Sequence, residues 1–225
     1  MSTLEITLGG DRAVLLPDRA LHLPEHDSVL VADLHWGKAA AFRAANVPVP
    51  TGTTASDLAR LTRVLHETRA TQLVVLGDLL HAKSGRQSGT LDAIAAWRTA
   101  HPALRIVLVR GNHDAHAGDP PPSLEIDCVD APWILGPFAC AHHPDESDAG
   151  YVLAGHLHPH VSLGGRGRQR VKLPCFAFGL RVGLLPAFAE FTGTGAFRAR
   201  GDERLFAIAD GAVVAIGASA TQFAR

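Results

Sequence analysis

Short runs of aliphatic residues recur along the chain, and each gives way abruptly to polar side chains. Four of these runs have the length and the Val, Leu and Ile content of buried parallel strands: residues 29–32, 73–76, 105–109 and 151–154. Residues 54–69 and 90–100 lie between them and have apolar side chains at helical spacing. Such alternation predicts an α/β sheet whose polar residues gather at the carboxyl edge.

The pattern changes in the second half of the chain, where few segments have helical spacing. Residues 133–135 and 138–141 are typical of short strands. Residues 205–216, with Asp210-Gly211 near the centre, predict a β-hairpin. We therefore expect a second sheet packed against the first, within one domain that spans residues 1–225.

Composition and charge narrow the function classes. The chain has 225 residues, 47% of them hydrophobic, and a formal net charge of −1, which predicts no strong general attraction to nucleic acid. Any basic surface must be local; residues 164–172 are the best candidate, although a solvated hairpin turn is favoured there. The three cysteines form no CxxC pair and predict reduced, buried thiols. Because no signal-peptide pattern or membrane-spanning run occurs, we expect a cytoplasmic protein without membrane contact.

Each predicted parallel strand runs directly into residues that can bind a metal ion. In chain order, these motifs are Asp33-Leu34-His35, Gly77-Asp78, Gly111-Asn112-His113-Asp114 and Gly155-His156-Leu157-His158. Alternate residues of an extended segment point the same way, so both ends of Asp-x-His or His-x-His can reach one ion. Gly111 is expected to let the chain turn sharply after its strand. Each motif alone is also typical of a polar loop, but four in succession indicate a shared metal site.

This series of motifs resembles the calcineurin-like metallophosphoesterase superfamily, whose pattern also includes an isolated histidine before Gly-His-x-His. His142 and His143 compete for that position, and His142 fits it better because it directly follows the predicted strand. The resemblance implies an α/β fold, a four-layer αββα sandwich of two mixed sheets flanked by helices. It also implies a metal-dependent phosphoesterase.

Further segments narrow the resemblance to the ligase-associated DNA-damage-response endonuclease branch of this superfamily. These segments are residues 33–38, 42–43, 47–52, 173–176, 185–188 and 191–193. The branch implies phosphodiester bonds of DNA as the substrate, and a DNA ligase and a helicase as partners. The residues themselves do not disclose these partners or the oligomeric state.

The superfamily implies two adjacent divalent metal ions. The ligands of one ion would be Asp33, His35, Asp78 and His158. The ligands of the other would be Asp78, Asn112, His142 and His156, so that Asp78 bridges the two. Two cations about 3.5–4 Å apart neutralise a phosphodiester and generate hydroxide near neutral pH for in-line attack on phosphorus. We expect manganese, with iron or zinc as alternatives, because mixed nitrogen and oxygen ligands do not fix the metal.

Other residues of the motifs are expected to act on the substrate. The resemblance implies that His113 faces the scissile phosphate, where it could protonate the leaving oxygen. Asp114 could hold the orientation of His113 or cap a helix. Candidates for phosphate contacts, from their place near superfamily motifs, are Lys38, Arg43 and Arg181. Histidines that could support the ligands are His81 and His160.

Two other functions remain open at this point. The same metal site could hydrolyse a small substrate, such as a cyclic nucleotide or a nucleotide sugar. Alternatively, the chain could be a phosphoesterase-like scaffold that binds partners without catalysis, although such proteins typically lose ligands and this chain keeps every one.

Overall fold

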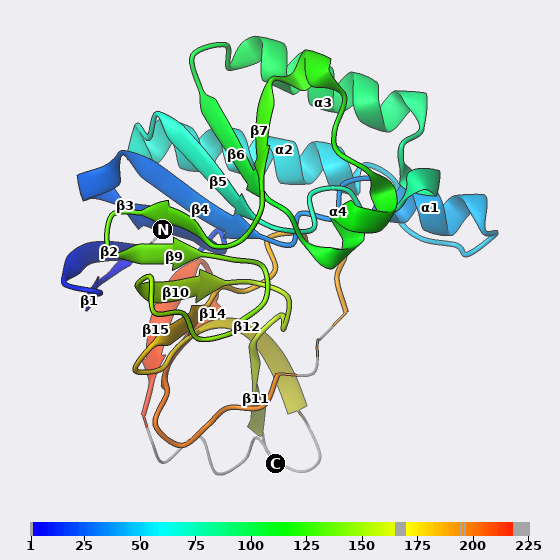
Figure 1. The fold of residues 1–225 in the computed structure, drawn as a ribbon. Helices are drawn as coiled ribbons and strands as arrows, with labels where there is room; N and C mark the ends of the chain where they lie inside the picture. Colours follow the sequence, from blue (N-terminus) through cyan, green and yellow to red (C-terminus); the bar gives the residue numbers. More distant parts are fainter. Residues whose placement is uncertain (1, 165–169, 194, 196, 218–225) are drawn as a thin grey trace.

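Two β-sheets pack face to face, with helices outside one of them (Figure 1). The computed structural model describes residues 2–164, 170–193, 195 and 197–217. The strands of the first sheet follow in chain order: β1 (Leu4–Leu8), β2 (Asp11–Leu16), β3 (Ala20–Leu23), β4 (Ser28–Ala32), β5 (Gln72–Leu76), β6 (Arg105–Val109) and β7 (Ile126–Val129). Strands β1 to β4 pair antiparallel and β4 to β7 pair parallel. The prediction of parallel strands that correspond to β4, β5 and β6 is confirmed.

Helices cover the outer face of this first sheet. They are α1 (Lys38–Ala44), α2 (Thr53–Thr68), α3 (Ser88–Ala100) and α4 (Asn112–Ala117), with short 3₁₀ turns η1 (Pro24–His26), η2 (Lys83–Gly85) and η3 (Pro122–Leu124). Alternate strand residues such as Val31 and Val75 pack against Leu61 of α2 and Ile94 of α3. Every second residue of the strands and the apolar faces of α2 and α3 therefore contribute to one apolar layer.

The second sheet has eight strands and is also mixed. They are β8 (Trp133–Leu135), β9 (Phe138–Cys140), β10 (Tyr151–Ala154), β11 (His160–Gly164), β12 (Arg170–Phe178), β13 (Val182–Leu184), β14 (Arg204–Ala209) and β15 (Ala212–Ile216). Strands β9, β10 and β13 pair parallel, and the other pairs are antiparallel. The predicted hairpin is confirmed as β14 and β15, so the expected sandwich of two mixed sheets is present.

A second apolar layer lies between the two sheets. Phe138, Phe176 and Phe178 of the second sheet fill it and are almost fully buried. Leu30 and Leu76 face them from the first sheet. Because both faces of β4 and β5 are buried, these strands are continuous aliphatic runs, as the sequence pattern indicated.

The outer face of the second sheet lacks the layer of helices that the αββα resemblance implied. In the described ranges every helix ends before residue 125. Val161 of β11 and Phe197 instead pack on this face. The face consists largely of small residues such as Ala154 and Ala177, so a strand and one aromatic side chain suffice to cover it.

Three predictions from composition can be compared with the structure. Among the described residues, no helix combines the length and the apolar character needed to cross a membrane. Cys140 and Cys175 are buried free thiols as expected, whereas Cys128 is partly exposed. Residues 165–169 lie outside the described part of the chain, so the basic patch at 164–172 stays a prediction.

Candidate metal centre

The predicted ligands meet where the carboxyl ends of strands from both sheets converge. Asp33 follows β4, Asp78 follows β5 and Asn112 follows β6, all on the first sheet. His142 follows β9, and His156 follows β10, on the second sheet. The sandwich brings together residues 123 positions apart, because the His156 N–H donates to the Asp33 carboxylate at 3.0 Å.

The backbone at these positions differs from the extended conformation that we expected. Five predicted ligands have positive φ angles, which place them in the left-handed region: Asp33 (54°), His35 (45°), Asp78 (55°), His156 (67°) and His158 (45°). Residues other than glycine rarely adopt this conformation, and it concentrates at functional sites. The extended-segment explanation for Asp-x-His and His-x-His is thus wrong, although the side chains do converge.

Hydrogen bonds between neighbouring strand ends hold this unusual backbone. The Asp33 N–H donates to the Gly77 carbonyl at 3.3 Å, and the His35 N–H donates to the Asp78 carbonyl at 2.8 Å. The Trp36 N–H donates to the Leu79 carbonyl at 2.8 Å. The parallel pairing of β4 and β5 continues in this way past the ends of both strands and fixes the two loops relative to each other.

The glycines of the motifs make room for the ligands. A Cβ on Gly77 would lie 2.1 Å from His142 Nδ1, and one on Gly111 would lie 2.4 Å from Asp78 Oδ1. A Cβ on Gly155 would lie 2.7 Å from Asp33 Oδ2. Gly111 has an extended backbone, with φ −103° and ψ 179°, so the expectation of a sharp turn there is wrong. Glycine is needed at this position because a side chain would collide with Asp78.

One group of donor atoms surrounds the Nε2 atom of His142. Asn112 Oδ1 lies 2.9 Å away, His156 Nδ1 3.0 Å away and Asp78 Oδ1 3.5 Å away. Since His142 Nδ1–H donates to the Leu76 carbonyl at 3.0 Å, its Nε2 atom carries a lone pair. The oxygens of Asn112 and Asp78 thus face this lone pair at a buried point, and a cation would relieve that repulsion.

A second group lies on the other side of Asp78. His35 Nε2 is 3.9 Å from Asp78 Oδ2, and His158 Nε2 is 3.6 Å from Asp33 Oδ1. His158 Nδ1–H donates to the Gly193 carbonyl, which leaves Nε2 free to bind. His35 Nδ1 is buried without a hydrogen-bond partner among the described residues. His158 thus has the division between a binding and an anchored nitrogen that metal-binding histidines show, whereas His35 has no anchor among the described residues.

The electrostatics of these buried groups favour a cation. Burial lowers the pKa of His35 to about 2, which keeps its imidazole in the neutral form that binds metals. Burial also raises the pKa of Asp78, and the neighbouring Asp33 carboxylate adds to that effect. The donor set of carboxylate, amide and imidazole atoms therefore fits divalent ions of borderline character.

Of the two adjacent histidines, His142 has the contacts of a ligand. It is 1% exposed and touches Asn112, Asp78 and His156. His143 is exposed, and its ring lies against His156 with 4.3 Å between centroids. His142 therefore lies among the other predicted ligands, and its role as a ligand stays a prediction.

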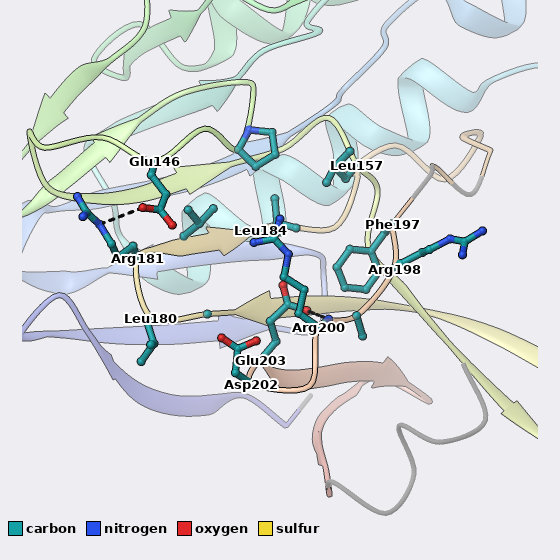
Figure 2. Close-up of a pocket in the computed structure, with 14 residues that line it drawn as sticks. Glu146, Leu157, Leu180, Arg181, Leu184, Phe197, Arg198, Arg200, Asp202 and Glu203 are labelled. Carbon is teal, nitrogen blue, oxygen red and sulfur yellow. Dashed lines mark hydrogen bonds and ion pairs between the residues drawn. The ribbon is translucent and has the colours of Figure 1, made fainter. Parts of the chain in front are cut away.

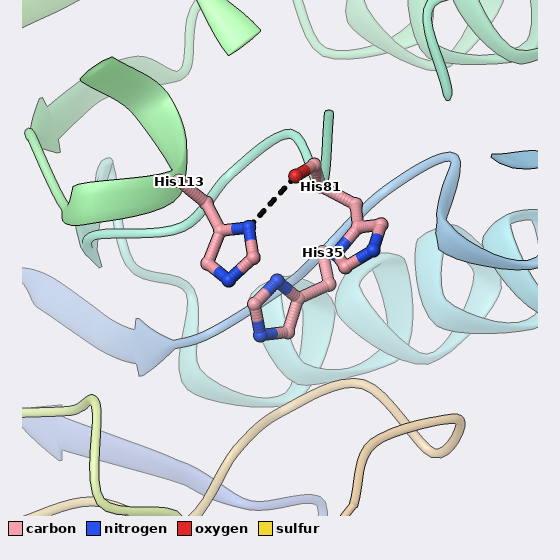
Figure 3. Close-up of side chains that lie close together, drawn as sticks. All are labelled: His35, His81 and His113. Atoms are coloured by element: carbon pink, nitrogen blue, oxygen red, sulfur yellow. Dashed lines mark hydrogen bonds between the residues drawn. The ribbon is translucent and has the colours of Figure 1, made fainter. Parts of the chain in front are cut away.

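His113 lies in the first turn of α4, beside the two groups of donors. Its Nδ1–H donates to the His81 carbonyl at 2.8 Å, so the neutral ring has its lone pair on Nε2. The His81 ring stacks on His113 with 5.0 Å between centroids and lies 5.5 Å from the His35 ring (Figure 3). His81 therefore contacts both His113 and His35. Its sequence position, three residues after Asp78, had indicated only a minor supporting role.

Asp114 has a different role from the one expected. Its carboxylate accepts the N–H groups of Asp78 at 2.7 Å, Leu79 at 3.0 Å, Leu80 at 3.4 Å and Gly111 at 2.9 Å. The expectation that Asp114 orients the His113 ring is wrong, since the His81 carbonyl does so. Asp114 caps α4 and ties it to the loop after β5, as the capping alternative had it.

A pocket of about 270 Å³ opens onto the donor groups, and Lys38 lines it with the histidines. Burial lowers the pKa of Lys38 while Asp33 and Asp78 oppose that effect. The other two predicted phosphate contacts lie elsewhere. Arg43 is exposed and donates to the Pro50 carbonyl at 2.9 Å. Arg181 is paired with two carboxylates outside this pocket.

The chain is similar to phosphoesterases and to a nuclease of known structure. The family model of calcineurin-like phosphoesterases matches residues 28–137. The crystal structure of Pseudomonas putida nuclease MPE has a TM-score of 0.84 and 44% sequence identity, covering 96% of this chain and 100% of that one. Yfce, a phosphoesterase from E. coli, has a TM-score of 0.43 and 15% identity over 85% of this chain and 98% of its own. No curated protein matches.

Proposed function

Because this chain belongs to the calcineurin-like metallophosphoesterase superfamily, we propose that it is a nuclease that hydrolyses phosphodiester bonds of DNA with two divalent cations. The similarity to nuclease MPE supports this proposal because it extends over 96% of the chain at 44% identity. It also favours the endonuclease branch to which the sequence motifs are similar, and with it a role in DNA repair.

The two groups of donors around Asp78 support two cation sites. We assign Asp33, His35 and His158 to one, Asn112, His142 and His156 to the other, and Asp78 to both. When bound, the cations would neutralise the phosphodiester and lower the pKa of water so that hydroxide is available near neutral pH. Manganese is the proposed metal, and iron and zinc suit the same donors.

His113 is the proposed proton donor to the leaving oxygen. Its Nδ1–H is held by the His81 carbonyl at 2.8 Å, so the second proton of the imidazolium sits on Nε2. As the bond between phosphorus and the leaving oxygen breaks, that proton passes from Nε2 to the oxygen. Lys38 lines the same pocket and would bind a non-bridging oxygen of the phosphate.

The observation that carries the proposal is the convergence of lone pairs at His142 Nε2 beside the buried Asp78 carboxylate. We expect Asp78→Asn to lower the Mn²⁺-dependent cleavage of DNA and of bis-p-nitrophenyl phosphate more than about a hundredfold. The matched control is Asp127→Asn, which removes an exposed carboxylate of β7 and should retain activity. Undiminished turnover by Asp78→Asn would contradict the proposal.

The size of the pocket supports one alternative substrate class. A volume of about 270 Å³ is small for a ligand site and could hold a single small nucleotide. A panel of DNA, cyclic nucleotides and nucleotide sugars separates the two proposals. A nuclease should prefer DNA by kcat/KM, whereas an enzyme for small nucleotides should prefer one member of the other two classes.

A further inference from the structure

A second, larger pocket lies over the outer face of the second sheet (Figure 2). Its volume is about 570 Å³, and its lining includes Leu157, Arg181, Leu184, Phe197, Arg198 and Arg200. Leu184 and Phe197 belong to the apolar layer on that face and give the pocket an apolar floor. The pocket thus combines hydrophobic surface with guanidinium groups, a combination suited to a nucleotide.

This second pocket shares a wall with the metal pocket. Leu157 lines the second pocket, while its neighbours His156 and His158 line the metal pocket. Gly195 also lines the metal pocket and packs so closely on Leu157 that a Cβ there would lie 2.3 Å from the Leu157 carbonyl oxygen. A chain of nucleotides whose scissile phosphate lies in the metal pocket could therefore continue into the second one.

The arginines of the second pocket differ in whether a carboxylate pairs with them. Arg181 is paired with Glu146 at 3.6 Å and with Asp148 at 3.2 Å. By contrast, the guanidinium groups of Arg198 and Arg200 make no ion pair or hydrogen bond with any described residue, and both side chains are exposed. Two positive charges are thus available for a ligand, on a chain whose formal net charge is −1.

Three acidic residues also line the pocket and limit this charge. Glu146 is engaged by Arg181. Glu203 accepts the backbone N–H of Arg200 at 2.6 Å and keeps its negative charge beside that residue. Asp202 remains as an exposed charge. The three arginines and the three carboxylates of the lining balance each other, so a phosphate contact here depends on the unpaired guanidinium groups of Arg198 and Arg200 and suits one phosphate better than a long run of them.

We propose that the second pocket binds the nucleotide next to the scissile phosphate in a DNA substrate. Arg198 and Arg200 would contact the phosphate of that nucleotide, and the floor at Leu184 and Phe197 would contact its sugar and base. This inference rests on the proposed nuclease function and assigns the substrate a second point of attachment. A small diester would occupy the metal pocket alone.

The test compares Arg198→Ala/Arg200→Ala with wild type on two substrates. On a thymidine oligodeoxynucleotide with Mn²⁺, we expect kcat/KM to fall about tenfold, mainly through KM, because phosphate contacts contribute chiefly to affinity. On bis-p-nitrophenyl phosphate, kcat/KM should stay within about twofold of wild type. The control Arg12→Ala/Arg105→Ala removes two exposed positive charges elsewhere and should resemble wild type on both substrates.

Binding without cleavage gives a second readout. Fluorescence anisotropy of the labelled oligodeoxynucleotide, measured with a chelator present, should show Kd about tenfold higher for the double variant. The slope of log Kd against log salt should fall by about 0.7 for each lost phosphate contact. The control variant should keep the wild-type Kd.

The outcomes separate this inference from the proposed function. Wild-type affinity and kcat/KM in the double variant would overturn the inference, and so would an equal loss with the control. An equal loss on bis-p-nitrophenyl phosphate would also overturn it, because the arginines would then act at the metal pocket. A wild-type protein that cleaves neither substrate with Mn²⁺ would overturn the nuclease proposal, while the anisotropy measurement would still decide whether the second pocket binds DNA.

Discussion

At the scale of single residues, the site depends on the glycines of the motifs as much as on the predicted ligands. Gly77, Gly111 and Gly155 each face a predicted ligand side chain at a distance that leaves no room for a methyl group. Gly111 shows the effect most clearly, because its extended backbone would accept any residue. Asp78 occupies the space where a Cβ of residue 111 would lie, so the motif needs glycine at this position.

Gly111→Ala should therefore weaken metal binding. The added Cβ would meet Asp78 Oδ1 at 2.4 Å and the Asp78 backbone nitrogen at 2.7 Å, which displaces the carboxylate proposed to serve both cations. We expect Mn²⁺ affinity, measured by isothermal titration calorimetry, to fall at least about tenfold. Gly89→Ala in α3 is the matched control, since nothing lies within 4 Å of its Cβ and Mn²⁺ affinity should not change. Equal affinity for Gly111→Ala and wild type would contradict this account.

The sequence predicted the identity of the donor residues better than their surroundings. The side chains of Asp33, His35 and Asp78 converge as expected, because each follows a buried parallel strand at one edge of the sheet. Their left-handed backbone was not predictable, since an aliphatic run marks the end of a strand but not the φ angles beyond it. Arg43 and Arg181 were misplaced because partners elsewhere, such as the Pro50 carbonyl, determine where a long side chain points.

At the scale of elements, α4 is held against β5 by one carboxylate. Asp114 accepts four backbone N–H groups, three of them from Asp78, Leu79 and Leu80 in the loop that follows β5. This arrangement fixes α4, and with it Asn112 and His113, relative to Asp78. The helix is too short and too polar to be recognised from an apolar period, so the sequence suggested only a possible cap.

The role of Asp114 predicts that its substitution acts through stability. Asp114→Asn replaces an acceptor oxygen with an amino group that faces backbone donors, which should lower the free energy of unfolding by about 2–4 kcal/mol. Urea unfolding measures this loss, and Asp92→Asn on the exposed side of α3 should change it little. An Asp114→Asn protein of wild-type stability that nevertheless lacks activity would restore the expectation that Asp114 orients His113.

Longer elements were easier to predict than short ones. The apolar period at 54–69 corresponds to α2 (Thr53–Thr68), and that at 90–100 corresponds to α3 (Ser88–Ala100), each within a few residues. Helix α1 (Lys38–Ala44) was not predicted, because a run of alanines has no amphipathic pattern and the helix spans only seven residues. Periodicity needs several turns before it separates one face from the other.

At the scale of the whole molecule, the candidate site depends on the packing of two sheets. The first sheet supplies Asp33, Asp78 and Asn112, and the second supplies His142 and His156. The change to short strands in the second half of the chain predicted a second sheet packed against the first, and the superfamily that the motifs resemble added the four-layer arrangement. The resemblance implied helices on the outer face of the second sheet, whereas Val161 of β11 and Phe197 cover its small residues in the described part of the chain.

The central claim is that residues of both sheets bind a pair of cations around Asp78. Anomalous diffraction at the manganese edge, from crystals grown with Mn²⁺, tests it most directly. The account predicts two peaks on either side of the Asp78 carboxylate, one beside His35 and His158 and the other beside His142 and His156. The absence of any peak at these side chains, in crystals whose Asp78 and histidines are well ordered, would contradict it.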